Sequence, residues 1–178
     1  KLIKDILEQY VTYDIKGICV SSAGVVNPEK GEIVYSGPTI PGYTGTKIKE
    51  EIEKEFGIRC EVENDVNYAG LGEYWKGAGK GSKSMVCMTI GTGIGGSVIL
   101  DGKLLNGIGY TAGEIGYMDV NGQFIQEVAS SRFLVKKVQE EKEKKEGMKQ
   151  NITGVDVFEL AKKGDEICID AIDMLIEN

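Results

Sequence analysis

Histidine is absent from the 178-residue sequence. This absence excludes Ser-His-Asp and Cys-His hydrolysis, proton transfer by imidazole and ligation of metals by histidine. The four cysteines, Cys19, Cys60, Cys87 and Cys168, include no C-x-x-C pair, and three of them lie in apolar runs. Buried free thiols in a reducing compartment are therefore expected, although a disulfide pair stays open at this point.

The sequence also lacks long apolar runs and basic patches. No run approaches the ~20 residues that span a bilayer, and no signal peptide precedes the first helical pattern. The lysines of residues 136–149 alternate with glutamates, and the formal net charge is −7, which disfavours a nucleic-acid-binding surface. With 41% hydrophobic and 28% charged residues, we expect a cytoplasmic globular protein of one domain or two small ones, without membrane or nucleic-acid partners.

Glycine, in contrast, is plentiful, and residues 90–96 read Ile-Gly-Thr-Gly-Ile-Gly-Gly. Three of these glycines satisfy the G-x-G-x-x-G dinucleotide pattern, but that fingerprint opens a helix. Here a strand-like run, residues 84–90, precedes the glycines, and a β-branched run, residues 97–100, follows them. Asp101-Gly102 closes the second run as a tight hairpin turn does. The pattern therefore predicts strand–turn–strand and contradicts a nucleotide-binding dehydrogenase.

The glycine turn predicts a phosphate-binding site. Glycine permits positive φ and close backbone approach, so successive N–H groups can bind an anion, and the Thr92 hydroxyl adds a donor. The alternative is a tight turn without a ligand. Because glycine weakens strands, four glycines this close together favour the phosphate site over a simple turn. They are Gly91, Gly93, Gly95 and Gly96.

The chain alternates between strand and helix patterns. Strands are predicted at residues 15–20, 32–35 and 58–62, and helices at 46–56, 66–75, 126–145 and from Thr153 and Asp165 onward. This alternation, with hairpins, indicates a layered α/β protein with a mixed sheet. The glycine-rich residues 77–82 are the best candidate for a boundary, which gives domains 1–76 and 77–178. Residues 140–146 are expected to form a solvated charge run.

Three carboxylates are candidates for chemistry. Asp65 follows a predicted strand, where a carboxylate can accept a proton from a substrate hydroxyl. An N-cap role for Asn64 or Asp65 is favoured by roughly two to one on spacing alone. Glu114, between glycines, fits a ligand for sugar hydroxyls and fits a surface loop equally well. Glu127 reads as a first-turn helix residue, and Tyr43 and Trp75 read as packing residues.

In order and spacing, five segments resemble the ROK family (repressor, open reading frame, kinase) of bacterial sugar kinases. They are Val20–Val26, Pro38–Tyr43, Glu63-Asn64-Asp65, Ile90–Gly96 and Ala112–Gly116, and they fall within residues 17 to 135. The resemblance implies the actin-like ATPase fold, with two ribonuclease-H-like α/β lobes and a cleft between them. It further implies a sugar kinase that requires ATP and Mg²⁺, and a homodimer as a common form.

The resemblance implies roles for individual residues. Asp65 would activate the sugar hydroxyl, and the 91–96 hairpin, with Thr92, would hold the ATP phosphates. Other residues would lie against the sugar: Asn64, Glu114, Gly24, Thr39 and Glu127. Residues up to about 75 would belong to the first, sugar-binding lobe, and residues after about 82 to the second, ATP-binding lobe.

The sequence departs from the family pattern in three ways. Tyr117 stands where many members have histidine, and the cysteine-rich zinc motif is missing, so no structural zinc is expected. The Asp-x-Gly-Gly-Thr phosphate loop would precede Lys1, and the adenosine-binding segment would follow the last helix. A fragment without these two segments is expected to have little kinase activity.

A sugar-responsive transcriptional repressor of the same family is the alternative. Such repressors carry an N-terminal helix-turn-helix, and none is visible in this sequence. Retention of Asp65 and of the whole glycine hairpin favours the kinase, because a sensor needs neither. The sugar itself is not evident from the sequence; a hexose, an amino sugar or a β-glucoside fits.

Overall fold

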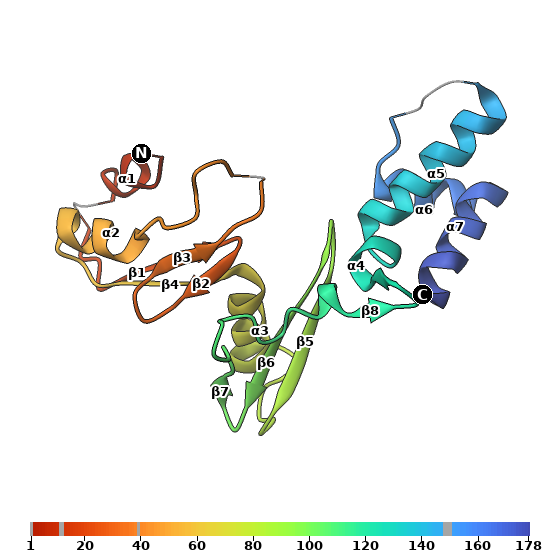
Figure 1. The fold of residues 1–178 in the computed structure, drawn as a ribbon. Coiled ribbons are helices and arrows are strands. Elements are labelled where there is room, and N and C mark those ends of the chain that lie inside the picture. The colour runs from red at the N-terminus through yellow and green to blue at the C-terminus, as the bar shows by residue number, and fades with distance from the viewer. Residues whose placement is uncertain (1, 11–12, 39, 148–150) are drawn as a thin grey trace. The chain divides into compact units, whose positions relative to one another are not determined.

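The computed structural model describes residues 2–10, 13–38, 40–147 and 151–178. The chain divides into two compact units, one with residues 1–85 and 98–112 and the other with residues 86–97 and 113–178. Strands alternate with helices in the first unit, whereas helices dominate the second (Figure 1). The predicted α/β class is therefore confirmed. None of the helices in these ranges is long and apolar enough to cross a bilayer.

Two small sheets organise the first unit. Its elements are α1 (Leu2–Leu7), β1 (Ile18–Ser22), β2 (Val25–Asn27), β3 (Glu32–Tyr35), α2 (Ile48–Phe56), β4 (Cys60–Asn64), α3 (Asp65–Lys76) and β7 (Lys103–Leu104). β1 and β4 pair in parallel, with Ile18 opposite Cys60 and Ser22 opposite Asn64, while β2 and β3 pair antiparallel. A parallel pair needs a long crossover, and the chain from β2 through α2 supplies it.

The core of the first unit lies between the strands and α2. Ile48 and Ile52 are one helical turn apart on α2, so both face the same side and are buried. They pack with Val26, Ile33, Cys60 and Val62. Burying a side chain of this size stabilises the fold by about 1.5–3 kcal/mol. Gly57 ends α2 in the left-handed region, with φ 65°, as its position predicts.

A three-stranded sheet carries the glycine motif. β5 (Met85–Ile90), β6 (Ile94–Leu100) and β7 are neighbours in that order. Asp101 and Gly102 both have positive φ, 49° and 78°, as a two-residue type I′ hairpin turn requires. The predicted hairpin is confirmed, and a strand, not a helix, follows the glycines. β6 begins three residues earlier than predicted, so Gly95 and Gly96 are strand residues.

Helices form most of the second unit (Figure 1). Its elements beyond the sheet are η1 (Ile115–Tyr117), β8 (Asp119–Val120), β9 (Gln123–Phe124), α4 (Ile125–Val128), α5 (Ser131–Glu146), α6 (Gly154–Lys162) and α7 (Glu166–Glu177). α5, α6 and α7 pack on one another. The cluster that they share contains Leu134, Val138, Ile152, Val157, Cys168 and Ala171.

Two predictions about this helical region are wrong. The single helix expected at 126–145 is interrupted, because the buried Ser130 caps α5 by accepting a hydrogen bond from Phe133 N (3.3 Å). The expected solvated run contains Lys142, which is 5% exposed and pairs with Asp165. Lys142 lies one turn beyond the core residue Val138 on the face of α5 that packs against α7, so its charge requires a partner there.

The helix starts predicted at residues 153 and 165 are confirmed. Thr153 and Asp156 form a reciprocal capping box at α6, and Asp165 accepts a hydrogen bond from Cys168 N at α7. The apolar Ile169 of α7 is exposed.

Candidate functional site

The carboxyl ends of β1 and β4 lie side by side, because the two strands are parallel and Ser22 is opposite Asn64. In open α/β sheets this edge is where ligands bind. Asp65 follows β4 directly as the first residue of α3, and its side chain is exposed. Its Oδ1 accepts a hydrogen bond from Val66 N (3.1 Å). A carboxylate with access to solvent therefore stands at this edge.

The neighbouring Asn64 is fixed at both ends of its amide. Oδ1 accepts hydrogen bonds from Val66 N (2.9 Å) and Asn67 N (3.1 Å), which confirms the N-cap interpretation. Nδ2 donates to Gly24 O (3.0 Å), in the turn after β1. Among the described residues this is the one partner found for Nδ2, which leaves its second N–H donor for a ligand. The cap and a ligand contact are compatible, since they use different atoms.

The turn after β1 is shaped by Gly24. This glycine has φ 92°, and a Cβ there would lie 2.6 Å from Tyr35 O. Ser22 Oγ is 2.7 Å from the hydroxyl of Tyr43, so a hydrogen bond ties the strand end to the loop of residues 36–47. Thr39 of this loop, a predicted sugar ligand, lies outside the described residues.

The two aromatic residues interpreted as packing residues differ. Tyr43 packs against the core of the first unit, as expected. Trp75 does not: it is 71% exposed, and the ammonium of Lys76 lies 4.7 Å from its ring centroid.

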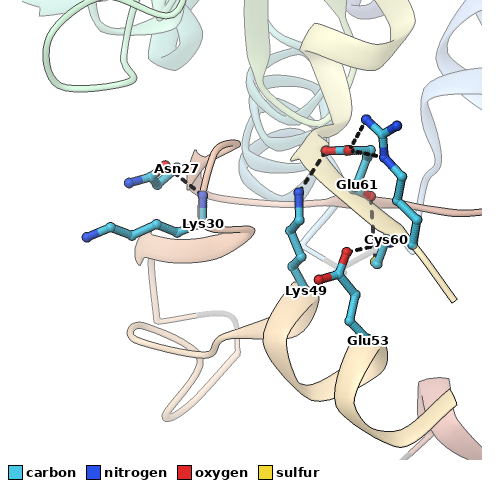
Figure 2. A network of polar contacts seen from close by, with 7 residues as sticks. Asn27, Lys30, Lys49, Glu53, Cys60 and Glu61 are labelled. Atoms are coloured by element: carbon cyan, nitrogen blue, oxygen red, sulfur yellow. Dashed lines mark hydrogen bonds and ion pairs between the residues drawn. The ribbon is translucent and has the colours of Figure 1, made fainter. Parts of the chain in front are cut away.

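The amino end of β4 carries a different polar network (Figure 2). Glu61 accepts hydrogen bonds from Arg59 Nε (2.9 Å) and Lys49 Nζ (3.2 Å), and these contacts hold its pKa below the ordinary value. Glu53 Oε1 accepts from Cys60 N (2.9 Å). Burial raises the pKa of the Cys60 thiol to about 11, so that thiol stays protonated at neutral pH.

In the second unit, the turn between β5 and β6 is short and exposed. Gly91 N donates to Gly93 O (2.9 Å), which closes the turn. Within the described residues, the N–H groups of Thr92 and Gly93 have no backbone partner. A Cβ at Gly91 would meet nothing within 4 Å. None of the four motif glycines has positive φ, so the turn offers open backbone donors without the left-handed residues that were expected.

Gly96 has a packing role that the glycine pattern does not predict. A Cβ at Gly96 would lie 2.5 Å from Gly113 O, and one at Gly116 would lie 2.1 Å from Ile94 O. The segment 113–116 therefore lies directly against β6, and its backbone positions the half-buried Glu114. The predicted contacts of Gly95 and Gly96 with phosphates, and of Glu114 with a sugar, remain predictions.

The start of α5 is attached to the glycine turn. Ser131 donates to Gly91 O from its backbone N (2.9 Å) and from its hydroxyl (2.7 Å). Glu127 is exposed in the first turn of α4 and accepts from Phe124 N (3.4 Å), which agrees with its first-turn interpretation. Tyr117, at the departure from the family pattern, stacks edge-on against Phe124.

The structure brings the predicted residues together within each unit. Gly24, Asn64 and Asp65 meet at one strand edge, with Ser22 and Tyr43 beside them. The sequence pattern gave no role to Glu63 and Asn67, which contact Asn64. β4 contains a second glutamate, Glu61, so the pattern did not single out Glu63. No cluster of three or more metal-ligating side chains occurs among the described residues.

Comparisons with known proteins identify the family. The ROK family profile matches residues 1–178. An uncharacterized protein of Clostridium perfringens (strain 13 / Type A) is 52% identical over 178 residues, which are 99% of this chain and 59% of that protein. A beta-glucoside kinase of Listeria monocytogenes serovar 1/2a is 44% identical over 105 residues, 59% of this chain and 35% of the kinase.

A solved structure shows the same fold. The ROK family glucokinase of Streptomyces griseus, in complex with glucose and AMPPNP, has a TM-score of 0.80 and 26% identity over 98% of this chain and 62% of that one. The fold is thus the α/β fold of the ROK kinases, in the actin-like ATPase class. The chain belongs to the ROK family. It spans 59% and 35% of the lengths of the two relatives above.

Proposed function

We propose that the protein is an ATP-dependent sugar kinase, which transfers the γ-phosphoryl group of ATP to a sugar hydroxyl. Relatives named beta-glucoside kinase and glucokinase support the reaction class. The observation that carries the proposal is the exposed carboxylate of Asp65 at the carboxyl end of two parallel strands, beside an asparagine whose amide is fixed. This is the kind of strand edge where α/β proteins bind ligands.

Asp65 would act as the general base. As the sugar oxygen forms its bond to Pγ, the hydroxyl proton passes to a carboxylate oxygen of Asp65 and the bond from Pγ to the bridging oxygen of ADP breaks. Phosphoryl transfer depends mainly on positioning and charge neutralisation, and a base typically contributes about 10²–10⁴-fold. Asn64 would orient a second sugar hydroxyl with its remaining N–H donor.

The turn at Gly91–Gly93 fits nucleotide phosphates. Its backbone N–H donors at Thr92 and Gly93 have no backbone partner in the part of the chain that the structure describes, and the absence of a side chain at Gly91 leaves room for close approach. Mg²⁺ is usually held by one or two carboxylates together with substrate phosphates. Bound together with the ATP phosphates, Mg²⁺ would supply neutralisation of their charge.

The proposed substrates are a hexose, an amino sugar or a β-glucoside. Gly24, Thr39, Glu114 and Glu127 are further proposed sugar contacts. Glu114 is the better candidate for a sugar contact than Glu127, because its segment is fixed by close backbone packing against β6. Glu127 is exposed and caps a short helix.

The test is ATP consumption by the protein expressed from its complete reading frame. Glucose, N-acetylmannosamine and β-glucosides are supplied in turn with MgATP. We expect ADP release that depends on one class of sugar and is abolished by EDTA. Sugar binding without turnover for any of them would overturn the kinase and favour a sugar-responsive sensor.

A further inference from the structure

Glu63, the residue before the Asn64-Asp65 pair, is a buried carboxylate. It is 6% exposed, and glutamate is almost never this buried unless it is paired. Among the described residues, no lysine or arginine forms an ion pair with it, in contrast to Glu61 two residues earlier. Its hydrogen-bond partners are the backbone N–H of Asn64 (2.7 Å) and Nδ2 of Asn67 (3.1 Å), both to Oε1.

These contacts form a closed ring around the junction of β4 and α3. Glu63 Oε1 accepts from Asn64 N, Asn64 Oδ1 accepts from Asn67 N, and Asn67 Nδ2 returns to Glu63 Oε1. Asn67 is itself 5% exposed, so two of the three side chains of the ring are buried, and Asn64 is half-buried. In the sequence, Asp65 lies between Asn64 and Asn67, and both of these residues are fixed by the hydrogen bonds of the ring.

The helix itself does not require the glutamate. Asn64 already supplies the N-cap by accepting two backbone N–H groups, and a buried carboxylate without a cation opposes folding. What the ring adds is a fixed direction for the first turn of α3, which starts with Asp65. A misplacement of about 1 Å in a reacting group lowers a rate by about 10²-fold, so this direction is what a base needs.

We propose that Glu63, together with Asn67, is a positioning residue that holds Asp65 in line with the sugar hydroxyl. This inference rests on the proposed kinase function. Asn64 is held independently, since its Nδ2 donates to Gly24 O. Loss of the ring is therefore expected to displace the base, Asp65, more than the sugar contact, Asn64. It should lower kcat and leave the KM for the sugar nearly unchanged.

The experiment compares four single variants and one double variant in the protein expressed from its complete reading frame, with MgATP and the sugar that it phosphorylates. For Glu63→Ala and Asn67→Ala we expect kcat to fall about 10- to 100-fold, with the sugar KM within about threefold. Glu63→Gln should keep kcat within about threefold, because its Oε1 can accept the same two hydrogen bonds. The double variant Glu63→Ala/Asn67→Ala should be no slower than either single variant, since each already opens the ring.

Glu53→Ala is the matched control. Glu53 Oε1 also accepts a backbone N–H of β4, but at Cys60, the other end of the strand. It should lower the midpoint of thermal unfolding without changing kcat. If Glu63→Ala does not fold, the kcat of Asn67→Ala tests whether the ring positions Asp65.

The outcomes separate the two proposals. A wild-type protein that phosphorylates no sugar overturns the kinase and this inference together. An active wild type whose Asn67→Ala or Glu63→Ala variant keeps kcat, like Glu53→Ala, overturns the positioning role alone, as does a Glu63→Gln variant as slow as Glu63→Ala.

Discussion

At the amino end of β4, Glu61 lies between Arg59 and Lys49, and Glu53 accepts the N–H of Cys60 (Figure 2). At the carboxyl end of the same strand, Glu63 and Asp65 form no ion pair with any described lysine or arginine, and amide groups bind Glu63 instead. At the amino end, where the strand has only a structural role, the carboxylate of Glu61 is neutralised by cations. At the carboxyl end, no cation among the described residues neutralises Asp65, the carboxylate that we propose as the base.

The strongest test of this difference is Asp65→Asn. The variant keeps the shape and the helix position of the side chain but cannot take a proton. We expect kcat to fall by about 10²–10⁴-fold, while the affinity for the sugar and the unfolding midpoint stay close to wild type. A coupled assay of ADP release measures kcat, titration calorimetry measures the affinity for the sugar, and thermal denaturation measures the midpoint. A wild-type kcat would show that the base has been assigned to the wrong residue.

Gly24→Ala tests the turn that anchors Asn64. The alanine would need φ near 92°, and its Cβ would lie 2.6 Å from Tyr35 O. We expect a loss of about 2–4 kcal/mol in the free energy of unfolding, from backbone strain and crowding together. Chemical denaturation measures it. Gly42→Ala is the matched control, because φ is also positive there (71°) but nothing lies within 4 Å; an equal loss in both would remove the crowding argument.

Glu53→Ala tests the amino end of the strand by stability alone. It leaves the N–H of the buried Cys60 without its acceptor, which costs about 1–3 kcal/mol. Urea denaturation followed by circular dichroism measures the loss. A loss in kcat of the same protein, without a change in its fold, would mean that the two ends of β4 are not functionally separate.

Glu61→Gln should have the smallest effect, and the effect should depend on pH. Because the Arg59 and Lys49 contacts hold the pKa of Glu61 below its ordinary value of 4.5, its ionised form favours the folded state. That contribution is complete above the unfolded pKa and is lost as the pH falls through the folded one. With 39% of the side chain exposed, we expect at most about 1 kcal/mol at pH 7.

The difference between wild type and Glu61→Gln is measured by denaturation at a series of pH values. It should shrink as the pH is lowered below 4.5 and as salt is added. A difference that grows toward low pH would contradict the lowered pKa.

Much of the local structure was predictable because neighbouring residues decide it. The cap at Thr153, the start of α7 at Asp165 and the turn at Asp101-Gly102 depend on side chains and φ angles within a few residues. The order of the ROK motifs likewise pointed to the family, which the comparisons confirm. The positions of strand ends were less predictable, since pairing with β1 sets where β4 ends.

Long-range packing accounts for the errors. Lys142 looked solvated within its charge run, but α7 lies against that face of α5 and buries it. Packing also adds a constraint at Gly96, since its missing side chain admits Gly113, while its phosphate contact stays a prediction. Trp75 was expected to pack, and no described residue covers most of it.

The sequence by itself determined the residue types of the candidate site and their order: a helix cap at Asn64 or Asp65, and a glycine hairpin further on. Only the tertiary structure decided how Asp65 is held. The bond from Asn64 to Gly24 joins segments 40 residues apart and depends on the parallel pairing of β1 with β4, which no local pattern of residues specifies. The ring through Glu63 and Asn67 spans only residues 63–67, but the folded chain is what buries these two side chains.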